Sequence, residues 1–309
     1  NELMTKNLKG IYAATVVPLR KNKSIDKNAL SKHIKDIIKT EGIKGLLLNG
    51  HAGENFTLNV NEQIKVIETA KKYKSIDKKL ISGLNFEDPL LALNVAKKMT
   101  KAGADAILIF PPFSWSQGIS DEMIFQHHKV ICNEINKPVF LYQSSIYSGH
   151  LSYKKDLLKK LLKIKNIIGV KEGSWDYKSY VNNYKFLKKI KKEFLVMASG
   201  DEHLYPCFKY ASDGSQVSLA AITPEKIVEL IRLIENKEFS KAKKLDKKLL
   251  ILAKNIYGKY PPNFATARIK YCLKVLKKIP SDLMRSSISV DTNEKIKLKK
   301  SLKTLGFKL

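Results

Sequence analysis

Short strand-like segments alternate with longer helix-like segments through residues 1–236 of the chain. The strand-like segments are short apolar runs followed by apolar residues at helical spacing, a pattern typical of a parallel sheet built from βα units. The predicted strands are Ile11–Val17, Ile43–Asn49, Leu80–Ser82, Ala106–Phe110, Val139–Tyr142, Ile167–Lys171, Phe194–Ser199 and Ser215–Leu219. The predicted helices begin near Asp26, Asn61, Glu87, Ser120, Ser152, Asp176, Asp201 and Thr223. This alternation leaves few folds open, all of them with parallel strands.

Some of the predicted helix starts carry residues that stabilise a first turn. Asp26, Asn61 and Ser120 can each accept a hydrogen bond from a free N–H group of the turn that follows. Thr223 can act in the same way, and Pro224 suits the first helical position because its missing N–H would have no partner there. We therefore predict helix N-termini at these positions.

Eight strands and eight helices in alternation favour a closed (β/α)8 barrel, the TIM barrel, over an open doubly wound sheet. The open sheet normally carries a glycine-rich turn after its first strand, whereas the first strand here runs into Val17-Pro18-Leu19-Arg20. Three further helical segments follow, at Glu238–Asn255, Asn263–Lys277 and Thr292–Leu302. Their apolar periodicity indicates a face that packs on the barrel or on a neighbouring subunit. The prediction is an α/β TIM barrel over residues 1–236, with a C-terminal helical extension, residues 237–309, packed on the barrel.

The chain carries 57 basic and 29 acidic residues, a formal net charge of +28. A basic field of this size can bind phosphate backbones non-specifically. Only four of the basic residues are arginines, and the lysines are spread along almost every helical segment. Because nucleic-acid recognition favours arginine and a localised basic surface, we predict no nucleic-acid partner. A non-catalytic barrel that binds nucleic acid stays as a remote alternative.

Membrane, metal and disulfide signals are all weak in this sequence. It has no run of about 18 apolar residues, and the segment Asn1–Lys6 lacks the apolar region of a secretory signal. The three cysteines, Cys132, Cys207 and Cys272, lie far apart and lack the spacing of zinc ligands. We predict a cytoplasmic protein with no membrane partner, no disulfide framework and no metal.

The reactive groups of a TIM barrel lie at the C-terminal ends of its strands. Two adjacent strand ends here carry a candidate nucleophile and a candidate group for proton transfer. Lys171 ends an apolar strand just before Gly173. Burial there would lower the pKa of the lysine, so that its amine could attack a carbonyl carbon and form a Schiff base. Tyr142, at the end of the preceding strand, supplies a group for proton transfer. After the second strand, Gly50 and Gly53 flank a turn whose N–H groups could hold a carboxylate. Together these residues outline a site for a 2-oxo acid.

The residues at these strand ends resemble those of the dihydrodipicolinate synthase / N-acetylneuraminate lyase family of pyruvate-dependent class I aldolases. The likeness runs from Gly10 to about Pro224. It rests on residues 10–18, Gly50-His51-Ala52-Gly53-Glu54, Leu141-Tyr142, Gly169-Val170-Lys171-Glu172 and Ser199-Gly200-Asp201. The resemblance implies that Lys171 forms the imine, that Tyr142 relays protons and that residues 50–53 cradle the carboxylate. It also implies a homotetramer that needs no cofactor.

Four departures from the family pattern leave the substrate open. His51 and Ala52 replace two hydroxyl residues of the cradle, and Phe113-Ser114 replaces a tyrosine pair. Tyr147 replaces an arginine that grips the second substrate's carboxylate in dihydrodipicolinate synthase, and Gln216 takes a position that is usually aliphatic. The candidate substrate-binding residues are Gly50, Ala52, Gly53, Tyr147, Gly200 and Gln216.

The predicted function is that of a Schiff-base-forming lyase acting on pyruvate or a related 2-oxo acid, by aldol condensation or cleavage. The alternative is a dehydratase or aldolase of 2-keto-3-deoxy sugar acids, because neutral Gln216 and Tyr147 would suit hydroxyl groups. The predicted catalytic residues are Lys171, Tyr142 and His51. Two roles stay open for His51, either acid/base catalysis or binding of the substrate carboxylate as an imidazolium.

Overall fold

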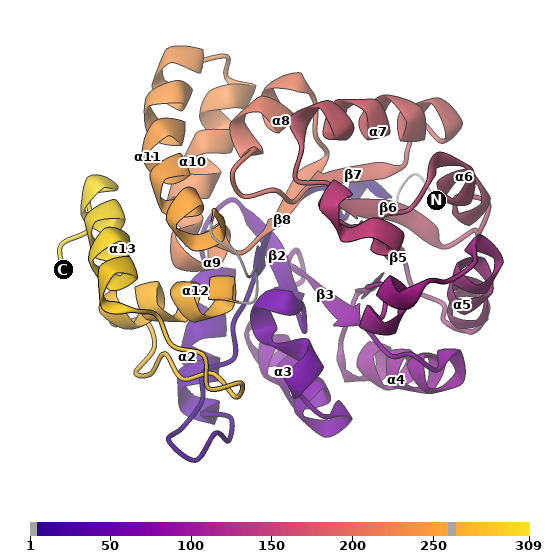
Figure 1. Cartoon of the computed structure of the whole chain (residues 1–309), viewed down its shortest axis with the longest axis horizontal. Coiled ribbons are helices and arrows are strands. Elements are labelled where there is room, and N and C mark those ends of the chain that lie inside the picture. The colour runs from indigo at the N-terminus through magenta and orange to yellow at the C-terminus, as the bar shows by residue number, and fades with distance from the viewer. Residues whose placement is uncertain (1–4, 259–263) are drawn as a thin grey trace.

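The computed structural model describes residues 5–258 and 264–309. Eight parallel strands pair in chain order, and β1 also pairs with β8, so the sheet closes into a barrel surrounded by helices (Figure 1). The strands are β1 Gly10–Ala14, β2 Ile43–Leu48, β3 Lys79–Leu84, β4 Ala106–Ile109, β5 Val139–Gln143, β6 Ile167–Glu172, β7 Leu195–Ala198 and β8 Gly214–Val217. The predicted TIM barrel is therefore confirmed.

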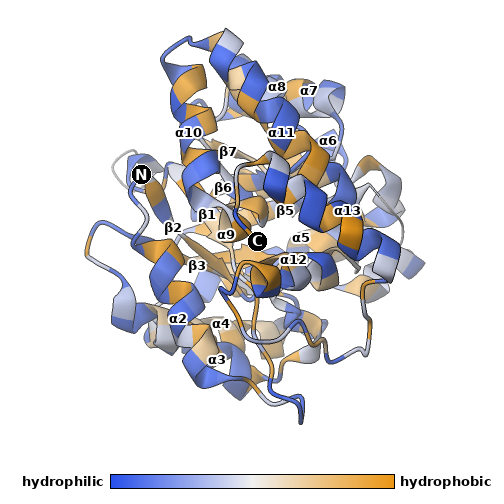
Figure 2. Ribbon diagram, turned by 90° about the vertical axis from the view of Figure 1, so that its left-hand side faces the viewer, coloured by the Kyte–Doolittle hydropathy of each residue, from blue (hydrophilic) through white to orange (hydrophobic). Residues whose placement is uncertain are grey.

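Helices cover the outside of the barrel, and short 3-10 helices occupy several loops at the C-terminal ends of the strands. The helices that follow β1 to β8 are α2 Lys27–Ile38, α3 Val60–Tyr73, α4 Pro89–Ala102, α5 Asp121–Glu134, α6 Lys155–Leu161, α7 Tyr177–Ile190, α8 Leu204–Tyr210, α9 Leu219–Ile222 and α10 Pro224–Glu235. The 3-10 helices are η1 His51–Gly53, η2 Asn55–Thr57, η3 Phe113–Gln117 and η4 Ile146–Leu151. Figure 2 shows the outer helices banded in blue and orange, in keeping with one buried and one solvated face.

The capping predictions are confirmed for two helices and wrong for a third. The side chains of Asp26 and Ser120 each accept a hydrogen bond from the N–H three residues further on. Helix α3, however, begins earlier than the prediction at Asn61. Asn59 caps it, because Glu62 lies three residues later and bonds back to the N–H of Asn59, forming a reciprocal capping box.

The predicted cap at Thr223 and the predicted helix start at Ser152 are not found either. Pro224 opens α10 as predicted, but the Thr223 side chain makes no capping hydrogen bond. Ser152 does not begin a helix. It ends η4, a 3-10 helix formed by the loop after β5, and α6 starts three residues later at Lys155.

The inside of the barrel holds a compact apolar cluster that is separate from the core between sheet and helices. Its buried members are Leu8, Tyr12, Ala14, Leu47, Ile81, Ala106, Leu108, Phe110, Phe140, Ile168, Leu195 and Met197. Ala52 and Tyr142 pack against this cluster and are only partly buried. Side chains thus fill the lower part of the barrel, and any ligand has to bind near its C-terminal end.

The helical extension consists of α11 Phe239–Tyr257, α12 Phe264–Val275 and α13 Thr292–Thr304, grouped on one side of the barrel (Figure 1). Helix α11 packs on α10 and α13, and α12 packs on α9 and η1. Asn263, at which the middle segment was predicted to begin, lies outside the described residues. The division of the chain at residues 236 and 237 stays a prediction, since one apolar core runs across it.

Ion pairs tie the extension to the loop after β2, which the apolar pattern alone does not predict. Lys270 of α12 is fully buried and donates to the Glu54 carboxylate, just after η1. Arg285 forms two hydrogen bonds with the Glu62 carboxylate of α3, at 2.8 and 2.6 Å. The extension therefore holds the turn that carries His51 from outside the barrel. Among the described helices, none is long and apolar enough to cross a membrane.

Candidate active site

Lys171 and Tyr142 lie side by side at the C-terminal ends of β6 and β5, where the strand register pairs them directly. The Nζ atom of Lys171 lies 5.1 Å from the centre of the Tyr142 ring and 5.9 Å from the centre of the Phe110 ring. Two residues before the lysine, a side chain at Gly169 would place its Cβ 2.6 Å from the Phe140 ring. Glycine at that position lets β6 pack closely over the interior of the barrel.

The surroundings of this pair shift both pKa values, and the lower value of Lys171 favours nucleophilic attack by its amine. Burial lowers the pKa of Lys171 to about 8, although the Asp201 carboxylate opposes the shift. A larger share of this lysine is therefore free amine near neutral pH than in a solvated lysine. Burial, together with the Glu172 and Asp201 carboxylates, raises the pKa of Tyr142 to about 12. The phenol thus stays protonated and can donate its proton.

His51 is packed among aromatic rings beside this pair. Its ring stacks on Phe110, with 4.3 Å between ring centres, and on Phe113, with 5.6 Å. It meets Tyr142 edge to face at 5.7 Å. Burial, and secondarily the charge of Lys171, lower the pKa of His51 to about 3. The imidazole is therefore neutral near pH 7, which disfavours binding of a carboxylate as an imidazolium.

The predicted carboxylate cradle forms the tight turn η1. Gly53 N–H donates to the Gly50 carbonyl and Glu54 N–H donates to the His51 carbonyl, each at 3.0 Å. The N–H groups of His51 and Ala52 open the turn and have no partner within it. The backbone of these two residues, rather than their side chains, therefore provides the donors that could bind a carboxylate. Gly50 has a φ of −87°, which any residue can adopt.

Gln216 and Gly200 lie on the other side of the barrel mouth. Gln216, on β8, is fully buried and pairs in register with Tyr12 of β1, whose ring fills the barrel interior. Neither its amide nitrogen nor its amide oxygen has a hydrogen-bond partner among the described residues. Gly200 follows β7, and its carbonyl accepts a hydrogen bond from the N–H of His203 at 2.8 Å. It thus shapes the turn that carries Asp201.

The structure does not bring Tyr147 together with the other predicted residues. It lies on η4 with 87% of its surface exposed, whereas Lys171 is held among buried rings. Phe113 is nearer to the site, because it stacks on His51 and meets Phe56 edge to face at 5.9 Å. The rim of the pocket on this side is therefore aromatic.

Asp201 is a residue of the site that was predicted as a helix start and as part of a family motif, but not as a catalytic or binding residue. Its carboxylate is buried and accepts hydrogen bonds from the Leu219 N–H at 2.9 Å and the Ser218 hydroxyl at 3.4 Å. Burial raises the pKa of Asp201 to about 7, while the Leu219 N–H, Lys171 and Ser218 lower it. Its place at the end of β7, within the motif residues 199–201, was the signal that could have identified it.

Tyr257 also reaches the site, from the last turn of α11. Its hydroxyl forms a hydrogen bond with the hydroxyl of Ser218, and its ring packs on Trp175 with 5.0 Å between ring centres. The sequence offered no signal for this contact, because an aromatic residue on an amphipathic helix looks like ordinary core packing. The helical extension thus contributes a side chain to the site as well as an anchor for η1.

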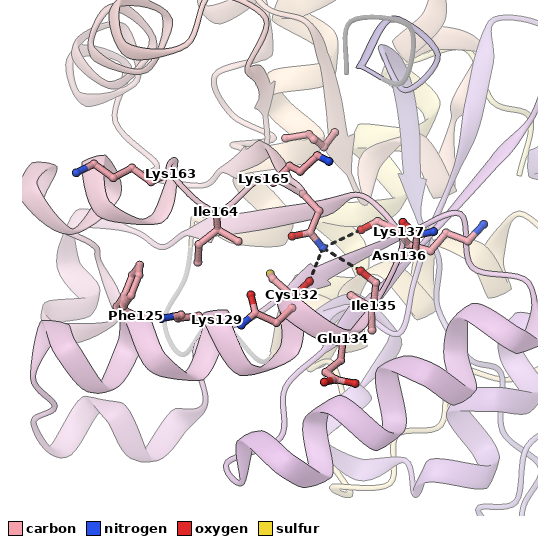
Figure 3. A pocket seen from close by; sticks show the side chains of 13 residues that line it. Phe125, Lys129, Cys132, Glu134, Ile135, Asn136, Lys137, Lys163, Ile164 and Lys165 are labelled. Carbon is pink, nitrogen blue, oxygen red and sulfur yellow. Dashed lines mark hydrogen bonds between the residues drawn. The ribbon is translucent and has the colours of Figure 1, made fainter.

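A pocket of about 740 Å3 lies elsewhere, between α5 and the connection from α6 to β6 (Figure 3). Lys129, Lys137, Lys163 and Lys165 line it. The side-chain amide of Asn166 donates to three backbone carbonyls beneath it (Figure 3). Since this residue precedes β6 and Lys171 comes near the end of that strand, the pocket lies at the opposite end of the barrel from the predicted site.

Known proteins have sequences similar to this one along nearly the whole chain. A model of the dihydrodipicolinate synthetase family matches residues 7–305. The chain is 28% identical over 300 residues to the 4-hydroxy-tetrahydrodipicolinate synthase of Methanococcus vannielii, covering 97% of this chain and 99% of that protein. It is also 28% identical over 261 residues to an uncharacterised DapA-like lyase of Pyrococcus furiosus, covering 84% and 85% of the two chains.

Solved structures show the same fold at lower sequence identity. Dihydrodipicolinate synthase from Agrobacterium tumefaciens superposes with a TM-score of 0.86 at 20% identity, covering 98% of this chain and 99% of the other. The chloride-inhibited dihydrodipicolinate synthase from Acinetobacter baumannii, solved in complex with pyruvate, has a TM-score of 0.85 at 22% identity, covering 97% and 99%. From the match across residues 7–305, the chain belongs to the dihydrodipicolinate synthetase family and is a lyase.

Proposed function

We propose that the protein forms a Schiff base between Lys171 and pyruvate or a related 2-oxo acid, and then makes or cleaves a carbon–carbon bond by aldol chemistry. The observation that carries this proposal is the pairing of Lys171, a lysine with a pKa of about 8, with Tyr142 on the adjacent strand. The relative from Acinetobacter baumannii, which was solved with pyruvate, supports the choice of substrate class.

In the proposed reaction, the free Nζ amine of Lys171 attacks the keto carbon of the 2-oxo acid. The phenol of Tyr142 donates a proton to the resulting hydroxyl, which leaves as water, and a protonated imine forms. The Tyr142 phenolate left by this step then takes a proton from C3 or from the C4 hydroxyl group, and the imine nitrogen accepts the electron pair of the C3–H bond or of the C3–C4 bond. The first route gives an enamine that adds to an aldehyde, and the second route cleaves an aldol.

His51 takes part in proton transfer in this proposal rather than binding the carboxylate as a cation. Its neutral ring lies edge to face with Tyr142, and its buried Nε2 has no hydrogen-bond partner among the described residues. Stacking on Phe110 fixes the plane of the ring. The carboxylate of the 2-oxo acid instead accepts hydrogen bonds from the backbone N–H groups that open η1, at His51 and Ala52.

A second candidate substrate class is that of 2-keto-3-deoxy sugar acids, which would be dehydrated or cleaved on the same lysine. The buried amide of Gln216 favours it, because an amide without a partner can both donate to and accept from substrate hydroxyl groups. Gly50, Gly53 and Gly200 shape the same pocket through their backbones, and exposed Tyr147 would be a residue of its outer rim.

We further propose that the protein acts in the cytoplasm as a homotetramer. Several large apolar side chains near the barrel mouth are exposed, and a second subunit would cover them. They are Phe56, Leu90, Leu91, Phe113, Met123, Ile146 and Tyr147. The free, buried cysteines suit a reducing compartment. Sedimentation velocity checks the assembly, and a monomer at micromolar concentration would contradict it.

Borohydride reduction in the presence of pyruvate tests the imine. We expect the intact mass to rise by one reduced pyruvate per chain, and peptide mapping to place it on Lys171. Lys171→Ala should abolish the adduct. Lys191→Ala is the matched control, because burial also lowers the pKa of this lysine, yet it bonds to the start of β6 at the other end of the barrel. An adduct retained by Lys171→Ala would overturn the assignment.

A further inference from the structure

Tyr257 belongs to the helical extension, yet its phenol is held inside the candidate active site. The hydroxyl bonds to Ser218, and the ring is packed on Trp175 at an interplanar angle of 53°. Trp175 is itself held by a hydrogen bond from its Nε1 to the Glu202 carboxylate at 3.4 Å. The phenol is therefore fixed from the ring side as well as from the hydroxyl side.

When Asp201 is ionised, the hydrogen bonds that lead to it from Tyr257 run in one direction only. An ionised carboxylate accepts hydrogen bonds and cannot donate. Ser218 must therefore use its single proton toward Asp201, which lies 3.4 Å away, and Tyr257 must donate to the oxygen of Ser218. A phenol proton at one end of this chain thus supports a negative charge at the other end.

Asp201 follows β7, the strand that pairs with β6, and Lys171 of β6 is the register partner of Met197 on β7. Burial lowers the pKa of Lys171, and the negative charge of Asp201 opposes this shift. Burial raises the pKa values of the phenols of Tyr142 on β5 and Tyr257 on α11, and the negative charge of Asp201 raises them further. Burial and the positive charge of Lys171 lower the pKa of His51 in η1. The Glu172 carboxylate likewise raises the pKa of Tyr142, and the Glu202 carboxylate raises that of Tyr257.

We propose that Tyr257 is a positioning residue of this site, which acts through Ser218 to keep Asp201 ionised and thereby to keep Lys171 in its ammonium form at neutral pH. The chain of hydrogen bonds would then set the pH at which the amine becomes free. This inference rests on the proposed function only in taking Lys171 as the nucleophile.

Tyr257→Phe should change the reactivity of Lys171 in the direction opposite to that expected from damaged packing. This difference separates a positioning role of Tyr257 from a purely structural one. Tyr257→Phe removes the terminal donor, so the Asp201 carboxylate is less stabilised and takes up a proton at higher pH. Lys171 then loses part of the charge that favours its ammonium form, and its amine becomes free at lower pH. We expect the reactivity of Lys171 near pH 7 to rise by about two- to threefold, as one weakened hydrogen bond to a charged group allows. Damage to packing would instead lower the reactivity of Lys171.

Competitive acetylation with acetic anhydride from about pH 6 to pH 10 measures the reactivity of the Lys171 amine in the absence of pyruvate. Mass spectrometry of the Lys171 peptide gives the apparent pKa of the amine. It should fall in Tyr257→Phe, fall similarly in Ser218→Ala, and fall no further in the double variant, because both changes break the same chain. Asp201→Asn should lower it most.

Tyr205→Phe is the matched control, because its buried hydroxyl has no hydrogen-bond partner among the described residues. We expect no change in the Lys171 titration there. An unchanged or higher apparent pKa in both Tyr257→Phe and Ser218→Ala would overturn the inference. Borohydride trapping with pyruvate, run in parallel, separates the two proposals. A wild-type protein with the expected titration but no pyruvate adduct would refute the imine chemistry alone.

Discussion

Lys171 on β6 is the direct cross-strand neighbour of Tyr142 on β5, and its Nζ lies 5.1 Å from the centre of the phenol ring. The hydrogen bonds of two paired strands fix this relationship. The amine and the proton donor therefore hold their relative position through the backbone of the barrel rather than through a loop. Such placement on rigid elements is what a reaction with repeated proton transfers needs.

The first prediction concerns stability, because a partly buried lysine with a lowered pKa reduces the free energy of unfolding over a defined pH range. The unfolded chain holds the proton of Lys171 up to about pH 10.5, whereas the folded chain holds it only up to about pH 8. This lysine is therefore destabilising below about pH 8, and the effect vanishes as the pH approaches about 10.5. Lys171→Met should raise the free energy of unfolding by about 1–2 kcal/mol at pH 7.

Urea denaturation at pH 7 and near pH 10.5 checks this prediction. The exposed residue Lys98 of α4 provides the control, since Lys98→Met should change the free energy of unfolding little at either pH. If the gain from Lys171→Met were equally large at both pH values, better apolar packing and not the removal of a buried charge would explain it.

The second prediction separates the roles of His51 and Lys171. His51→Ala should lower kcat by about 10²- to 10⁴-fold, the range for losing an acid/base group, while borohydride still traps pyruvate on Lys171. Because burial lowers the pKa of His51 to about 3, its titration should not shape the rate profile between pH 5 and pH 8. Steady-state kinetics across this range test both points. Weaker trapping with a higher KM and an unchanged kcat would instead favour binding of the carboxylate.

The third prediction concerns the buried pair between Lys270 and Glu54. Lys270→Met would leave the buried carboxylate without its charged partner, although the Arg285 N–H still donates to it, and such a loss typically costs about 3–5 kcal/mol. Because Glu54 directly follows η1, KM for the 2-oxo acid should rise as well. Denaturation and kinetics measure the two effects. Lys241→Met breaks the exposed pair with Glu238 and should cost less than about 1 kcal/mol. Equal losses of unfolding free energy in the two variants would show that burial does not make the pair between Lys270 and Glu54 more important for stability.

The fourth prediction uses Gln216 to distinguish the candidate substrates. Replacing its unpartnered amide by an apolar side chain of similar length, in Gln216→Met, should stabilise the free protein by about 1–3 kcal/mol. Turnover of a hydroxylated sugar acid should fall at least tenfold, because hydroxyl contacts are lost, whereas pyruvate trapping should be unchanged. Parallel assays with both compounds decide the matter. Equal effects on both would place Gln216 next to the shared 2-oxo acid portion.

Sequence reasoning anticipated the features of this molecule that depend on local order. A strand end is visible as an apolar run that stops, so Lys171 and Tyr142 could be predicted, and the closed barrel then places them together. The cap at Asn59 was missed because a polar residue two positions later also suited the role. Both the success and the error depend on residues close in the chain.

Contacts between distant residues could not be predicted in the same way. Ser218 and Tyr257 are 39 residues apart, and Glu54 and Lys270 are 216 residues apart. No periodicity links such positions, and each of these side chains has an ordinary explanation as core or surface. The exposure of Tyr147 depends likewise on how η4 coils, which the chain after β5 does not reveal.

The long separation between Glu54 and Lys270 has a consequence for biosynthesis. Glu54, next to the turn with His51, leaves the ribosome 216 residues before the lysine that anchors it, and the strands β3 to β8 emerge in between. A nascent chain can thus close its barrel while the turn beside the reactive lysine still lacks its anchor. Partly translated copies would hold Lys171 in place without a properly seated partner loop until Lys270 has emerged.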